Sequence, residues 1–333
     1  MPLDRTVLTS LLAGMLLAPV AHAGEAIAPV AAWSVQGDFE KNEEARTNLS
    51  GAACTSRVPP FRSCLIVNDQ KNYAQFFRIE GTTLVPGAVV RLREGGDGDP
   101  DLEGAAFDRG FFYAIGSHGR SRHANKPNDT SYAVFRFAVG RSGKPKSAMS
   151  EDHAAGVQSS ARLRAAIRDA RRVGTFYDKP LGQNGVNIEG IAVKDGRMHL
   201  GFRGPSVEGR GFILSVEADA VFGRKRLRAA VHALPLGETT GIRDLAAVRD
   251  GVLILTGPVN DQAVTPAVFL WNEKTGALKK LGELAIPEEY KQHKAETLLV
   301  LRDAKRRPYR VLVMFDGPSN AGPTEYEVPR DFR

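Results

Sequence analysis

The sequence predicts an all-β fold, a β-propeller of five blades with six as the alternative, and three observations support this prediction. Short apolar alternations bounded by Gly, Asp and Pro are frequent, whereas long helical periodicity is scarce. A small or acidic residue followed by glycine opens several of these stretches, as in "DLEGAAFD" and "NIEGIAVK". Strand-opening residues that recur in register indicate one structural unit used several times, which a propeller requires and a sandwich does not.

The first residues have the features of a secretory signal peptide. The segment "MPLDRTVLTSLLAGMLLAPVAHA" carries Arg5, an apolar run from Val7 to Val20 and the small-x-small ending Ala21-His22-Ala23. This run is shorter than the roughly 20 residues of a membrane span, and no later stretch comes closer. We therefore expect cleavage after Ala23, a soluble periplasmic or secreted protein without a transmembrane segment, and a single propeller domain over residues 24–333.

The two cysteines, Cys54 and Cys64, are ten positions apart in "CTSRVPPFRSC" and flank a Pro-Pro turn between two apolar runs. Export would place them in an oxidising compartment, where paired cysteines are the rule. The spacing therefore predicts a hairpin disulfide, and the alternative is a pair of unpaired buried thiols.

Alignment on the Glu-Gly pair gives five units of three or four strands each. Inner strands are expected at residues 48–53, 101–106, 187–192, 241–246 and 294–299. Second strands are expected at 64–70, 111–120, 198–205, 251–261 and 309–318, and third strands at 74–81, 132–139, 211–218, 267–276 and 324–329. Hairpin turns such as Asp195-Gly196 and Asp250-Gly251 connect neighbouring strands within a unit.

A helical insertion is expected over residues 150–175, between the second and third units. Ser160 is the expected N-cap and Gly174 the expected stop. Arginines cover most of the helix surface, and one face is apolar: Leu163, Ala166, Ile167, Ala170 and Val173. The net charge of +7 raises the question of nucleic-acid or anionic-membrane binding. We prefer a docked helix with solvated arginines and expect no nucleic-acid partner, because no aromatic residues interleave the basic runs.

Charged residues are expected to meet at one mouth of the propeller. The innermost strand of each blade lines the central channel, so residues at one register converge on the axis. That register holds Ser50, Glu103, Glu189, Arg243 and Glu296. The ends of the second strands add Asp69, His118, Arg203, Asp261 and Asp316. Ionised groups taken out of water need partners, so these side chains either pair with one another as structural salt bridges or bind a ligand.

Both interpretations of the mouth stay open. As a ligand site it would comprise Asp69, Glu103, His118, Glu189, Arg203, Arg243, Glu296 and Asp316. Catalytic candidates within this set are Glu103, His118, Glu189 and Arg203. A Ca²⁺ ion is the candidate cofactor, since Ca²⁺ accepts several carboxylate oxygens, and its expected ligands are Glu103, Glu189 and Glu296. The glycine after Glu103 and Glu189 also has a purely structural explanation, a close approach of backbones near the axis.

The paired motifs resemble those of a known family. "DLEGAAFD" with "IGSHGR", and "NIEGIAV" with "LGFRGP", are similar to exported bacterial proteins defined only as a domain of unknown function and predicted to be propellers. More distantly, the Glu-Gly repeats resemble phytase-like esterase propellers, which implies a calcium-dependent phosphoester or ester hydrolase. The chain departs from this pattern at Arg243-Asp244 and at Thr297, and these departures favour a mixed-charge pocket that could hold an anion.

Three functions from different classes follow. The first is a binding protein whose axial mouth holds a small polar or anionic ligand or a cation. The second is a metal-dependent hydrolase in which Arg203 and Arg243 stabilise developing negative charge. The third is a scaffold that presents its rim to an envelope protein. We rank the three functions in this order. The sequence does not establish whether the protein is an enzyme.

Overall fold

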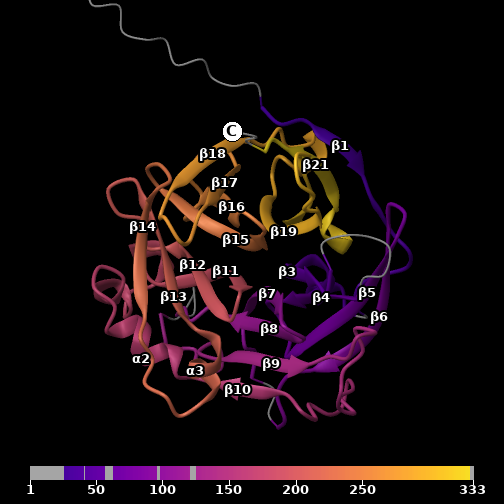
Figure 1. Ribbon diagram of the computed structural model, residues 1–333, viewed down its shortest axis with the longest axis horizontal. Helices are drawn as coiled ribbons and strands as arrows, with labels where there is room; N and C mark the ends of the chain where they lie inside the picture. Colours follow the sequence, from indigo (N-terminus) through magenta and orange to yellow (C-terminus); the bar gives the residue numbers. More distant parts are fainter. Residues whose placement is uncertain (1–25, 41, 57–62, 96–97, 121–124, 331–333) are drawn as a thin grey trace, which may run out of the picture.

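The computed structural model describes residues 26–40, 42–56, 63–95, 98–120 and 125–330. The expected signal peptide and the Pro-Pro turn lie outside this part of the chain. Five sheets surround a central axis as the blades of a propeller (Figure 1). The predicted all-β propeller is confirmed, with five blades rather than six.

Each blade contains an inner strand where the repeat predicted one. These strands lie closest to the axis in Figure 1, and they are β3 (Leu49–Cys54), β7 (Leu102–Asp108), β11 (Asn187–Lys194), β15 (Thr240–Val248) and β19 (Lys294–Arg302). The second strands pair with them in antiparallel fashion and are β4 (Ser63–Asn68), β8 (Phe111–Gly116), β12 (Arg197–Gly204), β16 (Gly251–Pro258) and β20 (Tyr309–Asp316).

Third and outer strands complete the blades. The third strands are β5 (Tyr73–Glu80), β9 (Val134–Ala138), β13 (Arg210–Glu217), β17 (Ala267–Trp271) and β21 (Thr324–Val328). The outer strands of the first four blades are β6 (Thr83–Arg91), β10 (Gln158–Ser160), β14 (Ala230–Pro235) and β18 (Leu278–Glu283).

The outer strand of the fifth blade comes from the opposite end of the chain. It is β1 (Pro29–Ala32), which pairs with β21 and so closes the ring (Figure 1). The next strand, β2 (Ser34–Val35), runs parallel to β6 of the first blade. The repeat in the sequence does not reveal this closure, because β1 lies far from the rest of its blade along the chain.

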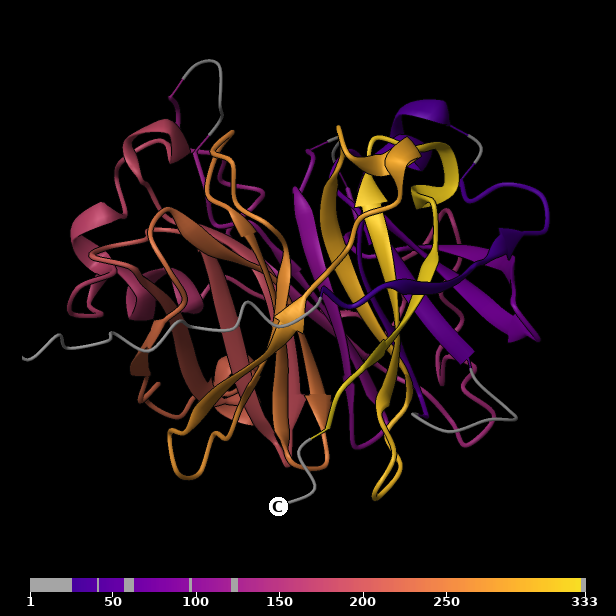
Figure 2. The same ribbon diagram turned by 90° about the horizontal axis from the view of Figure 1, so that it is seen from above.

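Helices are few and short. They are α1 (Glu43–Thr47), α2 (Leu163–Arg168) and α3 (Ala218–Phe222), with 3₁₀ turns η1 (Gly174–Phe176), η2 (Leu181–Gln183), η3 (Glu288–Tyr290) and η4 (Ser319–Ala321). Figure 2 shows α1 and η4 at the upper face of the disc, the face at which the inner strands begin. Among the described residues, no helix has the length and apolar character needed to cross a membrane.

The predicted helix is real but shorter than expected. It ends at Arg168. Beyond it the chain turns back, because Arg172 adopts a left-handed φ of 74°. The turn is so tight that a Cβ on Gly174 would lie 2.1 Å from the carbonyl oxygen of Arg168. The predicted N-cap is wrong: Arg162 holds that position, and the hydroxyl of Ser160 donates to the carbonyl of Val221 at 2.7 Å.

The predicted apolar face of this segment docks on the propeller. Leu163, Ile167 and Val173 are buried in the core that joins the second and third blades. Arg168, Arg171 and Arg172 remain exposed. The apolar residues dock as predicted, but not all of the arginines are solvated: Arg162 donates to the backbone carbonyls of Ala220 and Lys225, and Arg164 lies over the ring of Tyr132.

Small residues close the central channel. Inner strands from all five blades line a narrow cavity of about 50 Å³ on the axis, with apolar residues that include Ala52, Ala105, Ala192, Ala246 and Leu299. Alanine lets the strands approach closely, and the side chains leave space for little more than a water molecule or two. The two mouths of the propeller are therefore separated by an apolar plug.

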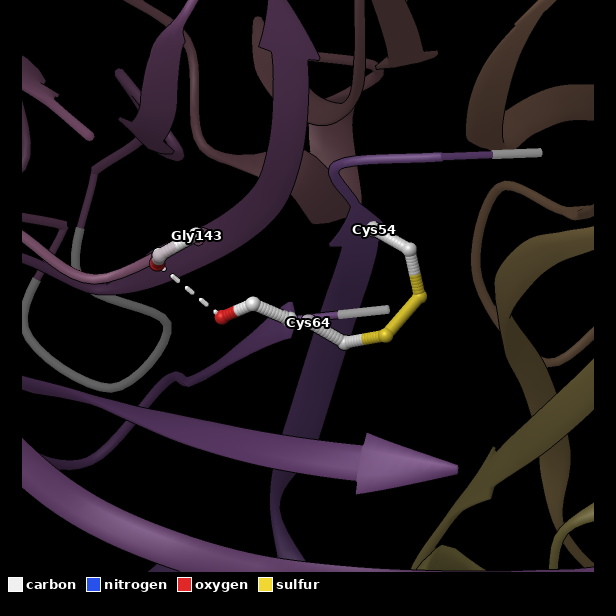
Figure 3. Close-up of a disulfide and its surroundings, with 4 residues drawn as sticks. Cys54, Cys64 and Gly143 are labelled. Carbon is white, nitrogen blue, oxygen red and sulfur yellow. Dashed lines mark hydrogen bonds between the residues drawn. A yellow bond between two sulfur atoms is a disulfide. The ribbon is translucent and has the colours of Figure 1, made fainter. Parts of the chain in front are cut away.

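The predicted disulfide is confirmed. Cys54 of β3 and Cys64 of β4 lie directly opposite each other and are bonded with an S–S distance of 1.97 Å (Figure 3). Beside it, the hydroxyl of Ser63 donates to the carbonyl of Gly143 at 3.1 Å, which attaches this hairpin to the second blade. A disulfide is compatible with export, because such bonds persist in oxidising compartments.

We expect the paired substitution Cys54→Ala/Cys64→Ala to lower the free energy of unfolding by about 2–3 kcal/mol, because the bond restricts the unfolded chain. Urea denaturation of the oxidised wild type and of the variant measures the difference. Coincident unfolding curves for the two proteins would show that the bond contributes nothing to stability.

Candidate functional site

A β-bulge in each inner strand directs the charged residues of the repeat toward the axis. The register between inner and second strand slips by one residue at Glu103, Glu189, Arg243 and Glu296, and at Gly51 in the first blade. A bulge leaves one residue unpaired and re-aims its side chain. The repeated opening pair is thus the sequence of a bulge, which explains why it recurs in register.

The glycine of the opening pair permits a close contact between blades. A Cβ on Gly51 would lie 2.4 Å from the Cα of Gly104 in the next inner strand, closer than real Cβ atoms come. The fourth blade has Asp244 at this position instead. Its carboxylate accepts hydrogen bonds from the backbone N–H groups of Leu245 and of Leu298 in the fifth blade, both at 2.7 Å. Both arrangements hold neighbouring inner strands together, as the structural explanation of the glycine predicts.

Two arginines and two glutamates form a buried chain of ion pairs. Glu189 Oε1 accepts a hydrogen bond from Arg203 Nη1 at 2.7 Å, and Glu189 Oε2 lies 3.0 Å from Arg243 Nε. Arg243 also contacts Glu296. The side chains of Glu189, Arg203 and Arg243 are almost fully buried. Two cations therefore neutralise two anions across the third, fourth and fifth blades, which matches the alternative of structural salt bridges for these four residues.

Among the described residues, Glu103 forms no ion pair with a cationic side chain. The hydroxyl of Ser50 donates to its Oε2 at 3.4 Å. Burial raises the pKa of Glu103 well above the ordinary glutamate range, and repulsion from Glu189, Asp101 and Asp69 adds to the increase. The neutral carboxyl is therefore favoured to higher pH than in an ordinary glutamate.

A cavity of about 320 Å³ lies at this mouth of the propeller. Of the residues that the structure describes, one basic residue, Arg120, lines it, together with polar amides and two apolar side chains. Six acidic residues contribute to its wall: Asp69, Asp99, Asp101, Glu103, Glu296 and Asp316. The expected mixed-charge pocket is therefore more acidic than predicted, because Arg203 and Arg243 are engaged in the ion-pair chain and do not line the cavity.

Crowding of these carboxyl groups alters their protonation. Burial, followed by repulsion from Asp101 and Asp316, raises the pKa of Asp69 to about 7. Burial also raises the pKa of Asp99. Asp101 accepts a hydrogen bond from the hydroxyl of Ser117. The cavity therefore either retains protons or gains stability from a positively charged occupant.

Two acceptor atoms of the wall lack donors. Within the described residues, Asp69 Oδ1 and Asn187 Oδ1 are buried and have no hydrogen-bond partner. Asn187 was missed in the sequence prediction, although a signal existed. The residue two positions before the aligned opening residue of the repeat (Ser50, Glu103, Glu189, Arg243 or Glu296) is polar in four blades, and three of these polar residues, Asn48, Asp101 and Asn187, line the cavity.

Two residues predicted at the mouth lie outside the cavity. His118, at a left-handed φ of 54°, is turned inward: its Nδ1 is 2.9 Å from the carbonyl of Gly116 and its ring packs against Tyr132. Burial lowers the pKa of His118 to about 4, so the ring is neutral. The side chain of Asp261, three residues beyond the end of β16, is 92% exposed and pairs with Lys294 at 2.9 Å.

The expected calcium ligands do not fit a calcium ion. Both carboxylate oxygens of Glu189 face arginine groups, Glu296 contacts Arg243, and burial raises the pKa of Glu103, which disfavours the charged form that would bind the ion. In the part of the chain that the structure describes, no group of three or more His, Cys, Asp or Glu side chains is arranged to hold a metal ion.

The raised pKa values predict pH-dependent stability. Asp69 and Glu103 titrate at higher pH in the folded chain than in the unfolded chain, so their contribution is most favourable below about pH 4 and is lost as the pH rises toward about 7. We expect the melting temperature to fall between about pH 5 and about pH 8, and Asp69→Asn to make this fall smaller. Asp195→Asn at the opposite mouth is the control, and equal pH profiles for the two variants would contradict the assignment.

Comparison with known proteins gives one family match. The pattern of a family described as "Protein of unknown function (DUF3616)" matches residues 136–328, more than half of the chain. No curated protein matches the sequence.

Similar folds occur among solved structures. Glutaminyl cyclase from Myxococcus xanthus has 11% identity and a TM-score of 0.45, with 92% of this chain and 100% of that chain covered. An exo-β-1,3-galactanase from Phanerochaete chrysosporium has 11% identity and a TM-score of 0.47, with coverages of 91% and 64%. The major allergen Mala s 1 of Malassezia sympodialis has 12% identity and a TM-score of 0.41, with coverages of 84% and 77%. These likenesses are too low to bear on function.

Proposed function

The chain belongs to the family described as "Protein of unknown function (DUF3616)", and for this member we propose that the axial cavity binds a small, positively charged ligand. The observation that carries the proposal is the composition of the wall, to which the described part of the chain contributes six acidic residues and one arginine. A cation in the cavity would relieve the repulsion that raises the pKa of Asp69. Binding and deprotonation of the wall would therefore occur together.

The same geometry disfavours an anion. Arg203 and Arg243, the two cations that could have attracted one, are neutralised by Glu189 and Glu296. Among the described residues that line the cavity, the basic one is Arg120, and its Nη1 lies 3.9 Å from Asp178. An anionic ligand would meet uncompensated repulsion from the acidic wall.

A thermal-shift screen tests this proposal. Ca²⁺, Mg²⁺, 1,4-diaminobutane, inorganic phosphate and a sugar acid would each be added to the protein at about pH 7.5, where the wall is largely ionised. We expect at least one cation, and neither anion, to raise the melting temperature. Asp69→Asn should weaken that cation at least tenfold, about 1.4 kcal/mol, whereas Asp195→Asn at the opposite mouth should not. Stabilisation by the anions alone would refute the proposal.

Hydrolysis is the second candidate function, and the raised pKa values of two carboxyl groups in the cavity favour it. Asp69, whose pKa is raised to about 7, and Glu103, whose pKa is raised by burial, line one cavity, and pairs of carboxyl groups with shifted pKa values serve as acid and base in hydrolases. Turnover of aryl esters or aryl phosphates, abolished by Asp69→Asn but not by Asp195→Asn, would establish catalysis. We expect cation binding without turnover.

A further inference from the structure

We propose that the ligand of the axial cavity is an organic ammonium ion rather than a metal ion, an inference that rests on the proposed cation-binding function. The cavity wall has two different parts. Acceptor atoms without donors among the described residues belong to Asp69 and Asn187, and two apolar side chains, Leu181 and Val186, also line the cavity. A ligand with N–H donors on a short apolar body complements both parts.

The unpaired acceptors call for hydrogen-bond donors. Asn187 is only 7% exposed, it lines the cavity, and its Oδ1 has no partner within the described residues. Asp69 also lines the cavity, and its Oδ1 atom is buried and has no hydrogen-bond partner among the described residues. A buried acceptor without a donor is unfavourable, and a primary ammonium group offers three donors and no acceptor. Such a group would satisfy both oxygens and neutralise carboxylate charge at once.

The carboxyl groups of the wall are poorly disposed for a metal ion. Asp99 Oδ1 already accepts a hydrogen bond from the backbone N–H of Asp101 at 2.8 Å, and Asp101 accepts one from Ser117. A calcium or magnesium ion needs several oxygens converging at short distances, and the described residues contain no such group. The cavity of about 320 Å³ is also large compared with the roughly 30 Å³ that one water molecule occupies in the liquid.

Two apolar side chains line the cavity together with Asn187. Leu181 and Val186 both line the cavity, and Val186 directly precedes Asn187. An alkyl chain attached to an ammonium group could therefore pack on these two side chains while its nitrogen faces Asn187. A hydrated metal ion would gain nothing from this part of the wall.

The segment that carries this wall is held in place. Asn184 adopts a left-handed φ of 62° and exchanges two hydrogen bonds of 2.8 Å with the backbone of Ser206 after β12. Gly185 lies so close to the chain before η2 that a Cβ there would be 1.9 Å from the carbonyl oxygen of Lys179. The acceptor and the apolar surface are thus preorganised, which favours affinity for a ligand of matching shape.

Isothermal titration calorimetry with a matched set of cations tests the inference on the wild-type protein. The probes are Ca²⁺, Mg²⁺, methylammonium, n-butylammonium, 1,4-diaminobutane and tetramethylammonium, which has charge but no N–H donor. We expect the primary ammonium ions to bind, tetramethylammonium to bind at least tenfold more weakly, and affinity to rise up to about fourfold for each added methylene. Asn187→Leu should reduce the preference for n-butylammonium over tetramethylammonium at least tenfold.

The possible outcomes separate this inference from the function on which it rests. If Ca²⁺ or Mg²⁺ binds in the cavity and the ammonium ions do not, or if tetramethylammonium binds as well as n-butylammonium, the inference is overturned while cation binding stands. If none of the cations binds, both fail. The wild-type comparison among ligands remains decisive even if Asn187→Leu does not fold.

Discussion

Replacing Glu189 with glutamine should lower the free energy of unfolding by about 3–5 kcal/mol, because the substitution leaves buried arginine charge without its partner. Glu189 is 2% exposed and contacts both Arg203 and Arg243. Glutamine keeps the size of the side chain, so the loss would report charge rather than packing. Chemical denaturation at a pH near neutrality measures this loss.

Glu217→Gln is the matched control for this experiment. Glu217 also pairs with an arginine, Arg197, at 3.3 Å, but its side chain is 67% exposed. Exposed ion pairs contribute little, and we expect a change of no more than about 1 kcal/mol. A wild-type unfolding curve for Glu189→Gln would show that the ion-pair chain does not hold the blades together.

Gly51→Ala should destabilise the protein by about 3 kcal/mol, the upper end of the usual range for overpacking. The added Cβ would lie 2.4 Å from the Cα of Gly104, and the atoms that it meets belong to backbone, which cannot rotate away. The inner strands of the first two blades would have to separate. Thermal and urea denaturation both measure the effect.

Gly182→Ala is the control for Gly51→Ala. A Cβ on Gly182 would meet no atom within 4 Å, and its φ lies outside the left-handed region. We expect this substitution to be neutral or slightly stabilising, by up to about 1 kcal/mol, because alanine restricts the unfolded chain. If the two glycine variants unfold alike, close strand contact is not the reason for the repeated glycine.

The sequence contained enough to predict the inner strands and the residues that meet on the axis. The opening pair is a bulge in every blade, and in the first three blades its glycine is also a close contact between neighbouring inner strands, so similar residues recur there. The charges at this register were placed correctly, but their pairing was not decided. Whether Arg243 contacts Glu189, Glu296 or a ligand depends on the rotation between blades, which no local pattern specifies.

Some cavity residues, the end of the helix and the strand β1 were not predicted, because they depend on the path of the chain between strands. Asp99 reaches the cavity from a loop, and Leu181 and Val186 reach it from the segment that precedes Asn187. The helix was predicted too long because the apolar spacing continues to Val173, whereas the backbone turns at Arg172. The strand β1 was missed because its partner β21 lies at the far end of the chain.

The central claim is that the acidic cavity exchanges protons for a cation, and proton release on binding tests it most directly. Titrating 1,4-diaminobutane into the protein near pH 7, in two buffers with different enthalpies of ionisation, gives the number of protons released by the complex. Because the pKa of Asp69 is raised to about 7, we predict a measurable release that Asp69→Asn diminishes and Asp195→Asn preserves. Binding heats that are independent of the buffer, or an absence of binding, would contradict the claim.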